Sequence, residues 1–159
     1  MPTYDMEKSL ISKGYNVICG VDEAGRGPLA GPVFAAAAVI KLGDDIDGLD
    51  DSKKLSEKKR ELLFDIIRER AVCFAISSAS VEEIERLNIL GATMLAMTRA
   101  VDMLPHPADY AIIDGNKVPS DLNGRALSLV KGDALSMSVA AASVLAKVSR
   151  DRYMKKQAE

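Results

Sequence analysis

Four acidic residues stand where an apolar run ends or where a glycine lies close by, and their side chains could do chemistry together. Asp22 and Asp114 directly follow apolar runs in VICGVD and YAIID, while Glu23 and Asp133 lie in the glycine-containing segments DEAGRG and KGD. Open α/β sheets usually carry functional side chains at such strand ends. Because neighbouring residues of a strand point to opposite faces, Asp22 and Glu23 can serve one site only if the backbone leaves strand geometry there, which Gly25 permits.

Carboxylates gathered in one place predict a divalent metal ion. They repel one another and raise one another's pKa unless a cation neutralises them, and hard oxygen ligands suit Mg²⁺ or Mn²⁺. Two such ions can activate a water molecule and stabilise the leaving oxygen when a phosphodiester is displaced in line. A single aspartate at a strand end is more often a turn residue, so this interpretation depends on the acids forming one cluster.

The composition argues against several other classes of protein. The 159 residues carry 21 Lys and Arg against 23 Asp and Glu, a net charge of −2, and 48% are apolar, as in one globular domain. No apolar run approaches the roughly 18 residues of a membrane span, and the acidic N-terminus does not resemble a secretory signal, so we expect a cytoplasmic protein. Cys19 and Cys73 lie in apolar runs and His106 lies between two prolines, which argues against a zinc site or a Ser/His/Asp triad.

The elements that must position the acids follow from hydrophobic periodicity. Short apolar runs predict strands at 16–21, 33–40, 72–79, 108–113 and 126–130. Helical spacing predicts helices that begin at Ser56 and at Ser80, the latter with a capping box to Glu83, and further helices over 88–103 and 138–157. Strands that are apolar throughout and separated by helices indicate an α/β domain with a mixed sheet, whose first two strands are joined as in a hairpin.

Four sequence blocks resemble the bacterial ribonuclease HII family, the type 2 ribonucleases H. They are GVDEAGRGPLAGPV at 20–33, DDSKKLSEKKRE at 50–61, IIDGN at 112–116 and KGDALSMSVAAASVLAKVSRDRYM at 131–154. Ordered blocks of this length cover nearly the whole chain and are far more specific than a short glycine pattern. The resemblance implies an RNase H-like fold, with a five-stranded mixed sheet flanked by helices, as a single catalytic domain over 1–159.

By the same resemblance, the protein is expected to be an endoribonuclease. It would cleave the RNA strand of RNA/DNA hybrids, and DNA duplexes at embedded ribonucleotides, by a two-metal-ion mechanism with Mg²⁺ or Mn²⁺, and we expect a monomer. Asp22, Glu23, Asp114 and Asp133 match the four acids of the family and would be both catalytic and metal-binding. Asp151 is not expected to be a ligand, because a helix that begins near 138 advances about 20 Å before reaching it; we expect it to pair with a basic neighbour.

The resemblance also implies substrate-binding residues. Gly25, Arg26 and Gly27 match the element that reads the ribose at the RNA-to-DNA step; glycine lets the backbone approach a sugar, and arginine offers a planar fork for a phosphate. Lys53 and Lys54 resemble phosphate-contacting lysines, with an ordinary solvated pair as the alternative. The basic residues of the last helix could either follow a phosphate backbone or solvate the helix; they are Lys147, Arg150, Arg152, Lys155 and Lys156.

The end of the chain raises a further expectation. Family members continue past this point into a segment with a GYPT-like tyrosine that stacks near the ribonucleotide, and none of the four tyrosines here lies in such a motif. We therefore expect the C-terminal segment, and with it part of the substrate platform, to be missing. Two alternatives remain: a hybrid-binding form with impaired catalysis, or another metal-dependent phosphoryl-transfer enzyme, although a Walker-type phosphate loop is not found.

Overall fold

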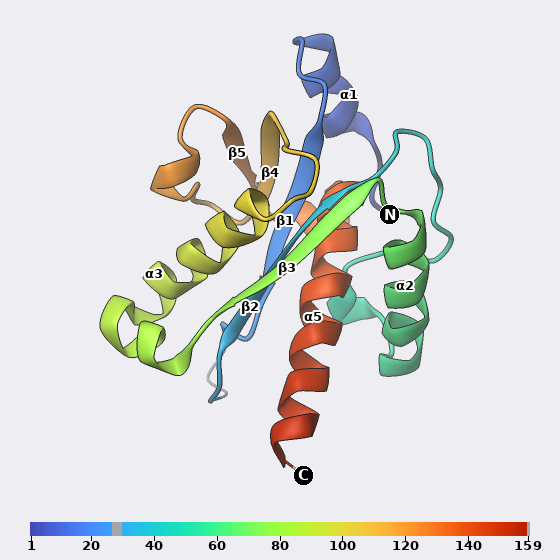
Figure 1. Cartoon of the computed structure of the whole chain (residues 1–159). Helices are drawn as coiled ribbons and strands as arrows, with labels where there is room; N and C mark the ends of the chain where they lie inside the picture. The colour runs from blue at the N-terminus through green and yellow to red at the C-terminus, as the bar shows by residue number, and fades with distance from the viewer. Residues whose placement is uncertain (27–29, 159) are drawn as a thin grey trace.

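The computed structural model describes residues 1–26 and 30–158 and contains a five-stranded sheet between helices (Figure 1). The strands are β1 (Ile18–Ala24), β2 (Val33–Val39), β3 (Cys73–Ala79), β4 (Tyr110–Asp114) and β5 (Ala126–Leu129). The α-helices are α1 (Asp5–Ser12), α2 (Glu57–Arg70), α3 (Val81–Asp102), α4 (Gly132–Leu135) and α5 (Met137–Ala158). Two short 3₁₀ helices are η1 (Ser52–Lys54) and η2 (Ser120–Leu122).

The sheet is mixed, and its order is β3-β2-β1-β4-β5. β1, β2 and β3 pair antiparallel, so the predicted hairpin-like connection between the first two strands is confirmed. β4 pairs parallel with both β1 and β5. Because β1 and β4 run in the same direction with Val21 opposite Ile113, their carboxyl ends lie side by side at one edge of the sheet.

Helices cover both faces of the sheet: α3 packs on one face, and α5 with α2 packs on the other (Figure 1). The alanines of β2 alternate between the two cores, with Ala35 and Ala37 toward α3 and Ala36 and Ala38 toward α5. These small side chains let both helices approach the sheet closely. Among the described residues, none of the helices combines the length and apolar character needed to cross a membrane.

Gly20 brings the start of α5 into direct contact with β1. A Cβ atom at this position would lie 2.2 Å from the backbone carbonyl carbon of Ser138, closer than real Cβ atoms come to backbone. Only glycine fits here, two residues before Asp22 on the same face of the strand. The first turn of α5 is therefore fixed against the strand that carries the first candidate acid.

Most of the predicted elements are present, with three differences. β1 continues to Ala24, beyond the predicted end at Val21. The helices predicted from Ser80 and over 88–103 form one helix, α3, which has the predicted capping box and a kink at Asn88 (φ 62°). The short helices α1 and α4 were not predicted, because eight and four residues span too few turns for a helical pattern to be recognised.

Candidate active site

Three aspartates from three separate segments meet at the carboxyl edge of β1 and β4. Each of Asp22, Asp114 and Asp133 offers a carboxylate oxygen, and these oxygens all lie within 4.8 Å of one another. The parallel pairing of β1 with β4 brings the first two together, and α4 supplies Asp133. The backbone N–H of Asp133 donates to Asp114 Oδ1 over 3.4 Å, and a Cβ at Gly132 would lie 3.2 Å from that oxygen. The absence of a side chain at Gly132 therefore leaves space for the carboxylate of Asp114.

Burial makes these acids costly to ionise. Asp22 is 4% exposed and Asp133 is 8% exposed. Burial raises the pKa of Asp22 well above its ordinary value, and the neighbouring carboxyl groups of Glu23 and Asp114 raise it further. Burial also raises the pKa of Asp133 to about 7, assisted by contact with the carboxyl group of Asp51 and by the charge of Asp114. Such a group of acids binds either protons or a cation.

The donor set fits a hard divalent cation. It consists of carboxylate oxygens, which Mg²⁺ and Mn²⁺ prefer. Within the described part of the chain, Asp22, Asp114 and Asp133 form no direct ion pair with a basic side chain, which leaves their oxygens free of a cationic partner. The three aspartates could therefore hold a metal ion.

Glu23 lies beside this group. Its backbone N–H donates to Asp22 Oδ1 over 2.8 Å, and its carboxyl group is near enough to raise the pKa of Asp22, after the larger effect of burial. The strand does not end before Glu23, as a shared site was expected to require, but continues to Ala24. Glu23 Oε2 is nevertheless buried with no hydrogen-bond partner among the described residues. Glu23 thus lies at the border of the cluster, with a buried carboxylate oxygen that could serve as a further ligand.

The acids line a cavity of about 350 Å³ that also contains basic and hydroxyl groups. Arg26 lines it, and Lys53 lines it from η1. Lys54, by contrast, is exposed and does not belong to the described lining of this cavity. Gly27 lies outside the described residues. A larger cavity of about 410 Å³ near α1 has a mostly apolar lining that includes His106, and it does not contain the acid cluster.

Gly25 adopts a conformation that favours glycine, and an arginine of α5 supports the loop beneath it. Its φ is +95°, and a Cβ there would lie 2.0 Å from Arg150 Nε. Arg150 is 4% exposed, and its guanidinium donates to the carbonyl oxygens of Pro32 and Ala30, each over 3.1 Å. Arg150 was predicted only as one of several basic residues on the last helix. Its burial against this loop could not be inferred from its sequence spacing.

Asp51 is a residue near the site that the sequence analysis did not identify. It caps η1 by accepting a hydrogen bond from the backbone N–H of Lys53 over 2.9 Å, and its carboxyl group contacts that of Asp133. The available signal was the aspartate itself, directly before the segment 52–54, because Asp is a favoured helix N-cap residue. The adjacent acidic and basic residues of DDSKK concealed it.

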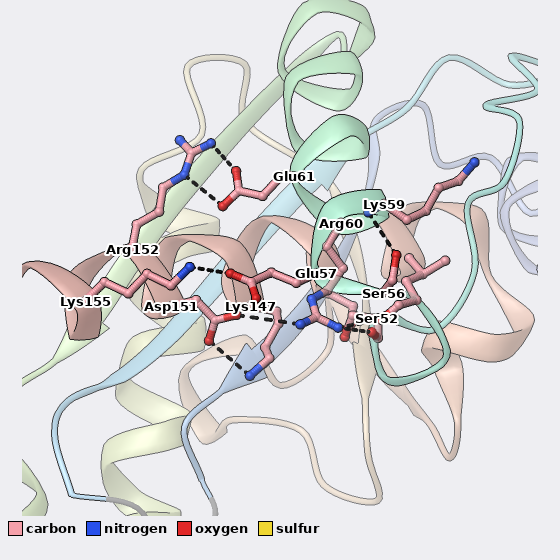
Figure 2. Close-up of polar contacts among 12 residues, drawn as sticks. Ser52, Ser56, Glu57, Lys59, Arg60, Glu61, Lys147, Asp151, Arg152 and Lys155 are labelled. Carbon is pink, nitrogen blue, oxygen red and sulfur yellow. Dashed lines mark hydrogen bonds and ion pairs between the residues drawn. The ribbon is translucent and has the colours of Figure 1, made fainter.

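Asp151 behaves as expected. It forms ion pairs with Lys147 over 3.0 Å and with Arg60 over 3.9 Å, and it is not one of the clustered acids. Two further basic residues of α5 also have intramolecular partners: Arg152 pairs with Glu61 and Lys155 with Glu57 (Figure 2). The structure therefore favours packing and solvation of the helix over a free basic face for most of these residues.

Comparison with known proteins identifies the family. The neighbouring solved structures define the fold as RNase H-like: ribonuclease H2 from Pyrococcus horikoshii has a TM-score of 0.74 at 27% identity, covering 89% of this chain and 75% of that one. RNase HII from Archaeoglobus fulgidus, in its complex with PCNA, has a TM-score of 0.72 at 29% identity, covering 88% and 74%. A family model described as Ribonuclease HII matches residues 19–159. The chain belongs to the ribonuclease HII family.

Curated relatives agree with this assignment. Ribonuclease HII of Burkholderia ambifaria is 58% identical over 143 residues, which are 90% of this chain and 65% of that protein. The protein of the same name from Dechloromonas aromatica is 58% identical over 138 residues, covering 87% of this chain and 70% of the relative. The chain thus spans about two thirds of the length of these relatives.

Proposed function

We propose that this chain carries the active site of an endoribonuclease that hydrolyses the RNA strand of RNA/DNA hybrids and cuts DNA duplexes at embedded ribonucleotides. The observation that carries the proposal is the meeting of three aspartates from β1, β4 and α4 within 4.8 Å, two of them buried. Membership of the ribonuclease HII family supports this choice of reaction. In the proposed assignment, Asp22, Glu23, Asp114 and Asp133 are the metal-binding and catalytic residues.

The cofactor proposed for this site is Mg²⁺ or Mn²⁺, bound as a pair of ions. Bound there, the metal would activate a water molecule and stabilise the oxygen that leaves the phosphate. The buried acids fix the positions of their oxygens before the substrate arrives, since β1, β4 and α4 are held by the sheet and by α5. A structural relative, Bst-RNase HIII, has been solved in complex with Mn²⁺; at 24% identity it is evidence for the fold alone.

The residues around the acid cavity supply the proposed recognition of substrate. Arg26 and Lys53 line the cavity with positive charge and are suited to phosphate groups. The backbone at Gly25 lies at the same cavity and has no side chain to block a sugar, so we assign Gly25, Arg26 and Gly27 to the 2′-hydroxyl, which distinguishes RNA from DNA. Lys54, which is exposed, remains a second proposed phosphate contact.

Cleavage of a duplex with one embedded ribonucleotide, and of an RNA/DNA hybrid, tests this function with Mg²⁺ and with a chelator. We expect cutting only with the metal. Asp133→Asn should abolish it, whereas Asp151→Asn, the matched substitution at an acid of α5 outside the cluster, should retain it. A nucleotide hydrolase would leave both duplexes intact, and binding without cleavage would favour the hybrid-binding alternative.

Asp22→Asn tests whether the acids form one shared site. Turnover should be lost, yet the metal-free protein should remain as stable as the wild type or become more stable, because one of several repelling charges is removed. The asparagine oxygen can still accept the hydrogen bond from the N–H of Glu23. Thermal melts in chelator measure this; a large loss of stability would contradict a shared site.

A further inference from the structure

Lys53 reaches the acid cavity from a short segment that needs external support. This segment, η1, has only three residues and follows a connection without regular structure. Two contacts support its start: Asp51 accepts from the backbone N–H of Lys53, and Ser143 of α5 donates to the hydroxyl of Ser52 over 2.7 Å in a buried contact. Lys53 itself is exposed, so its own side chain contributes little to holding the segment.

Arg60 supplies a third contact, and Figure 2 shows its guanidinium between Ser52 and Asp151. From the first turn of α2, its Nη1 donates to the carbonyl oxygen of Leu55 over 2.6 Å and to that of Ser52 over 3.1 Å. Its Nη2 faces Asp151 of α5 across 3.9 Å, and its side chain is only 15% exposed. One guanidinium therefore connects the two carbonyls that flank Lys53 and Lys54 to the long helix α5.

Two other ion pairs join the same helices but do not reach η1. Glu61 pairs with Arg152, and Glu57 pairs with Lys155, in both cases between α2 and α5 (Figure 2). Both pairs are more exposed than the Arg60 contact, and exposed pairs contribute little stability. They provide an internal comparison, because Arg152 has the same charge and bridges the same helices.

We propose that Arg60 is a positioning residue that holds Lys53 at the acid cavity, so that the Lys53 ammonium meets a phosphate of the bound nucleic acid. The inference rests on the proposed function, since it requires a nucleic acid at this cavity. Arginine is suited to the role because its planar fork donates several hydrogen bonds in fixed directions, whereas lysine carries a point charge on a flexible stem. Arg60→Lys therefore keeps the charge and removes the geometry.

The salt dependence of binding tests this role directly. Each phosphate neutralised by the protein contributes roughly −0.9 to the slope of log K against log salt for a duplex. Binding of a short RNA/DNA hybrid is measured by fluorescence anisotropy without divalent ions, at a temperature at which circular dichroism shows every variant folded. Lys53→Ala should reduce the steepness of the slope by about one contact. Arg60→Lys should reduce it equally, and the double variant should reduce it no further.

Arg152→Lys is the matched control and should keep the wild-type slope. Hydrogen exchange gives a second readout that needs no nucleic acid: the backbone amides of 53–55 should exchange faster in Arg60→Lys and not in Arg152→Lys. The proposal is overturned if Arg60→Lys keeps the wild-type slope or exchange rates, or if its effect on the slope adds to that of Lys53→Ala. A wild-type chain that binds the hybrid but never cleaves it contradicts the proposed function and leaves these comparisons valid, whereas one that does not bind contradicts both.

Discussion

Asp133 has a carboxyl group whose protonation should be visible in the stability of the protein. Its pKa in the folded state is raised to about 7, chiefly by burial, from its ordinary value of 3.8. Between these two values the folded state binds more protons than the unfolded state, so the free energy of unfolding falls as the pH rises. Without metal, we expect the contribution of Asp133 to stability to decline from about pH 4 to about pH 7 and then to level off.

Comparison with Asp133→Asn isolates the contribution of this carboxyl group. Denaturant unfolding of the wild type and of this variant, in chelator across the pH range, should give curves that diverge as the pH rises, with the wild type losing more stability. Because a metal ion competes with the proton, added Mg²⁺ should stabilise the wild type more at pH 8 than at pH 5. Parallel curves for the two proteins would show that Asp133 does not titrate in this range.

Gly25 allows a prediction that separates backbone strain from a steric clash. Gly25→Ala should destabilise the protein by about 1–3 kcal/mol, because the methyl group meets Arg150 and φ is positive. Gly124→Ala is the control: Gly124 has a φ of +86°, but its Cβ would meet nothing within 4 Å. The two variants are compared by their loss of unfolding free energy in urea, and the difference gives the cost of the contact between the methyl group and Arg150. Substrate binding should weaken only in Gly25→Ala, while the affinity for Mg²⁺ should change little. Equal losses of stability in the two variants would show that the methyl group at position 25 has no costly clash with Arg150.

For individual residues, the sequence was informative where the type of side chain and the surrounding hydrophobic pattern indicate the same role. Asp22 and Asp114 stand at the ends of apolar runs, which made them candidates, although that position alone is more typical of a turn residue. Arg60 and Asp51 could not be recognised, because their roles depend on contacts with segments whose relative position only the folded chain defines. The same holds for Arg150, which appears in the sequence as one more cation on a basic helix.

Among the elements, the contact between β1 and α5 is the most sensitive to a small change. Gly20→Ala would place a methyl group 2.2 Å from the backbone of Ser138, and backbone cannot move aside as a side chain can. We expect a loss of about 3 kcal/mol or more, since helix α5 must shift away from the strand. Gly91→Ala, within α3, should be nearly neutral in the same unfolding measurement, because its nearest neighbour is a side chain and alanine favours a helix. If Gly20→Ala lost as little stability as Gly91→Ala, α5 could move away from β1 at little cost.

The long elements were predictable because their patterns are strong, whereas their ends depend on tertiary contacts. Ser56 and Ser80 cap α2 and α3 as their sequences indicate. β1 extends past its apolar run because β2 pairs with it as far as Ala24, which overrides the polar character of Asp22 and Glu23. α4 follows Lys131, a non-glycine residue with a φ of 58°, and no local pattern predicts this conformation.

Across the whole molecule, the N-terminal helix is connected to the candidate site by a buried carboxylate. Glu7 of α1 is 3% exposed, and its Oε2 accepts from the hydroxyl of Ser136 over 2.8 Å and from the backbone N–H of Ser138 over 3.1 Å. Glu7 thus caps the start of α5, which follows the short helix α4 that carries Asp133. The family match begins at residue 19, so α1 lies outside the matched residues. The sequence alone gave no reason to connect Glu7 with the site.

Glu7→Ala should therefore lower the free energy of unfolding by about 1–3 kcal/mol, because a buried hydroxyl and a backbone N–H lose their acceptor. Glu7→Gln should cost less, since the amide oxygen can accept both hydrogen bonds. Denaturant unfolding of the two variants, in chelator, measures the difference. If both lose the same amount, the charge of Glu7, rather than its hydrogen bonds, holds the start of α5.

The parallel pairing of β1 with β4 has a consequence for how the chain folds. The two strands are separated in sequence by β2, α2, β3 and α3, and Asp133 comes later still, so the three aspartates meet only after most of the chain has found its place. The proposed cation site would therefore be absent from a nascent chain until α4 has been synthesised. An ion that binds only this late arrangement would not accelerate folding; it would slow unfolding, and so extend the lifetime of a molecule that has already folded.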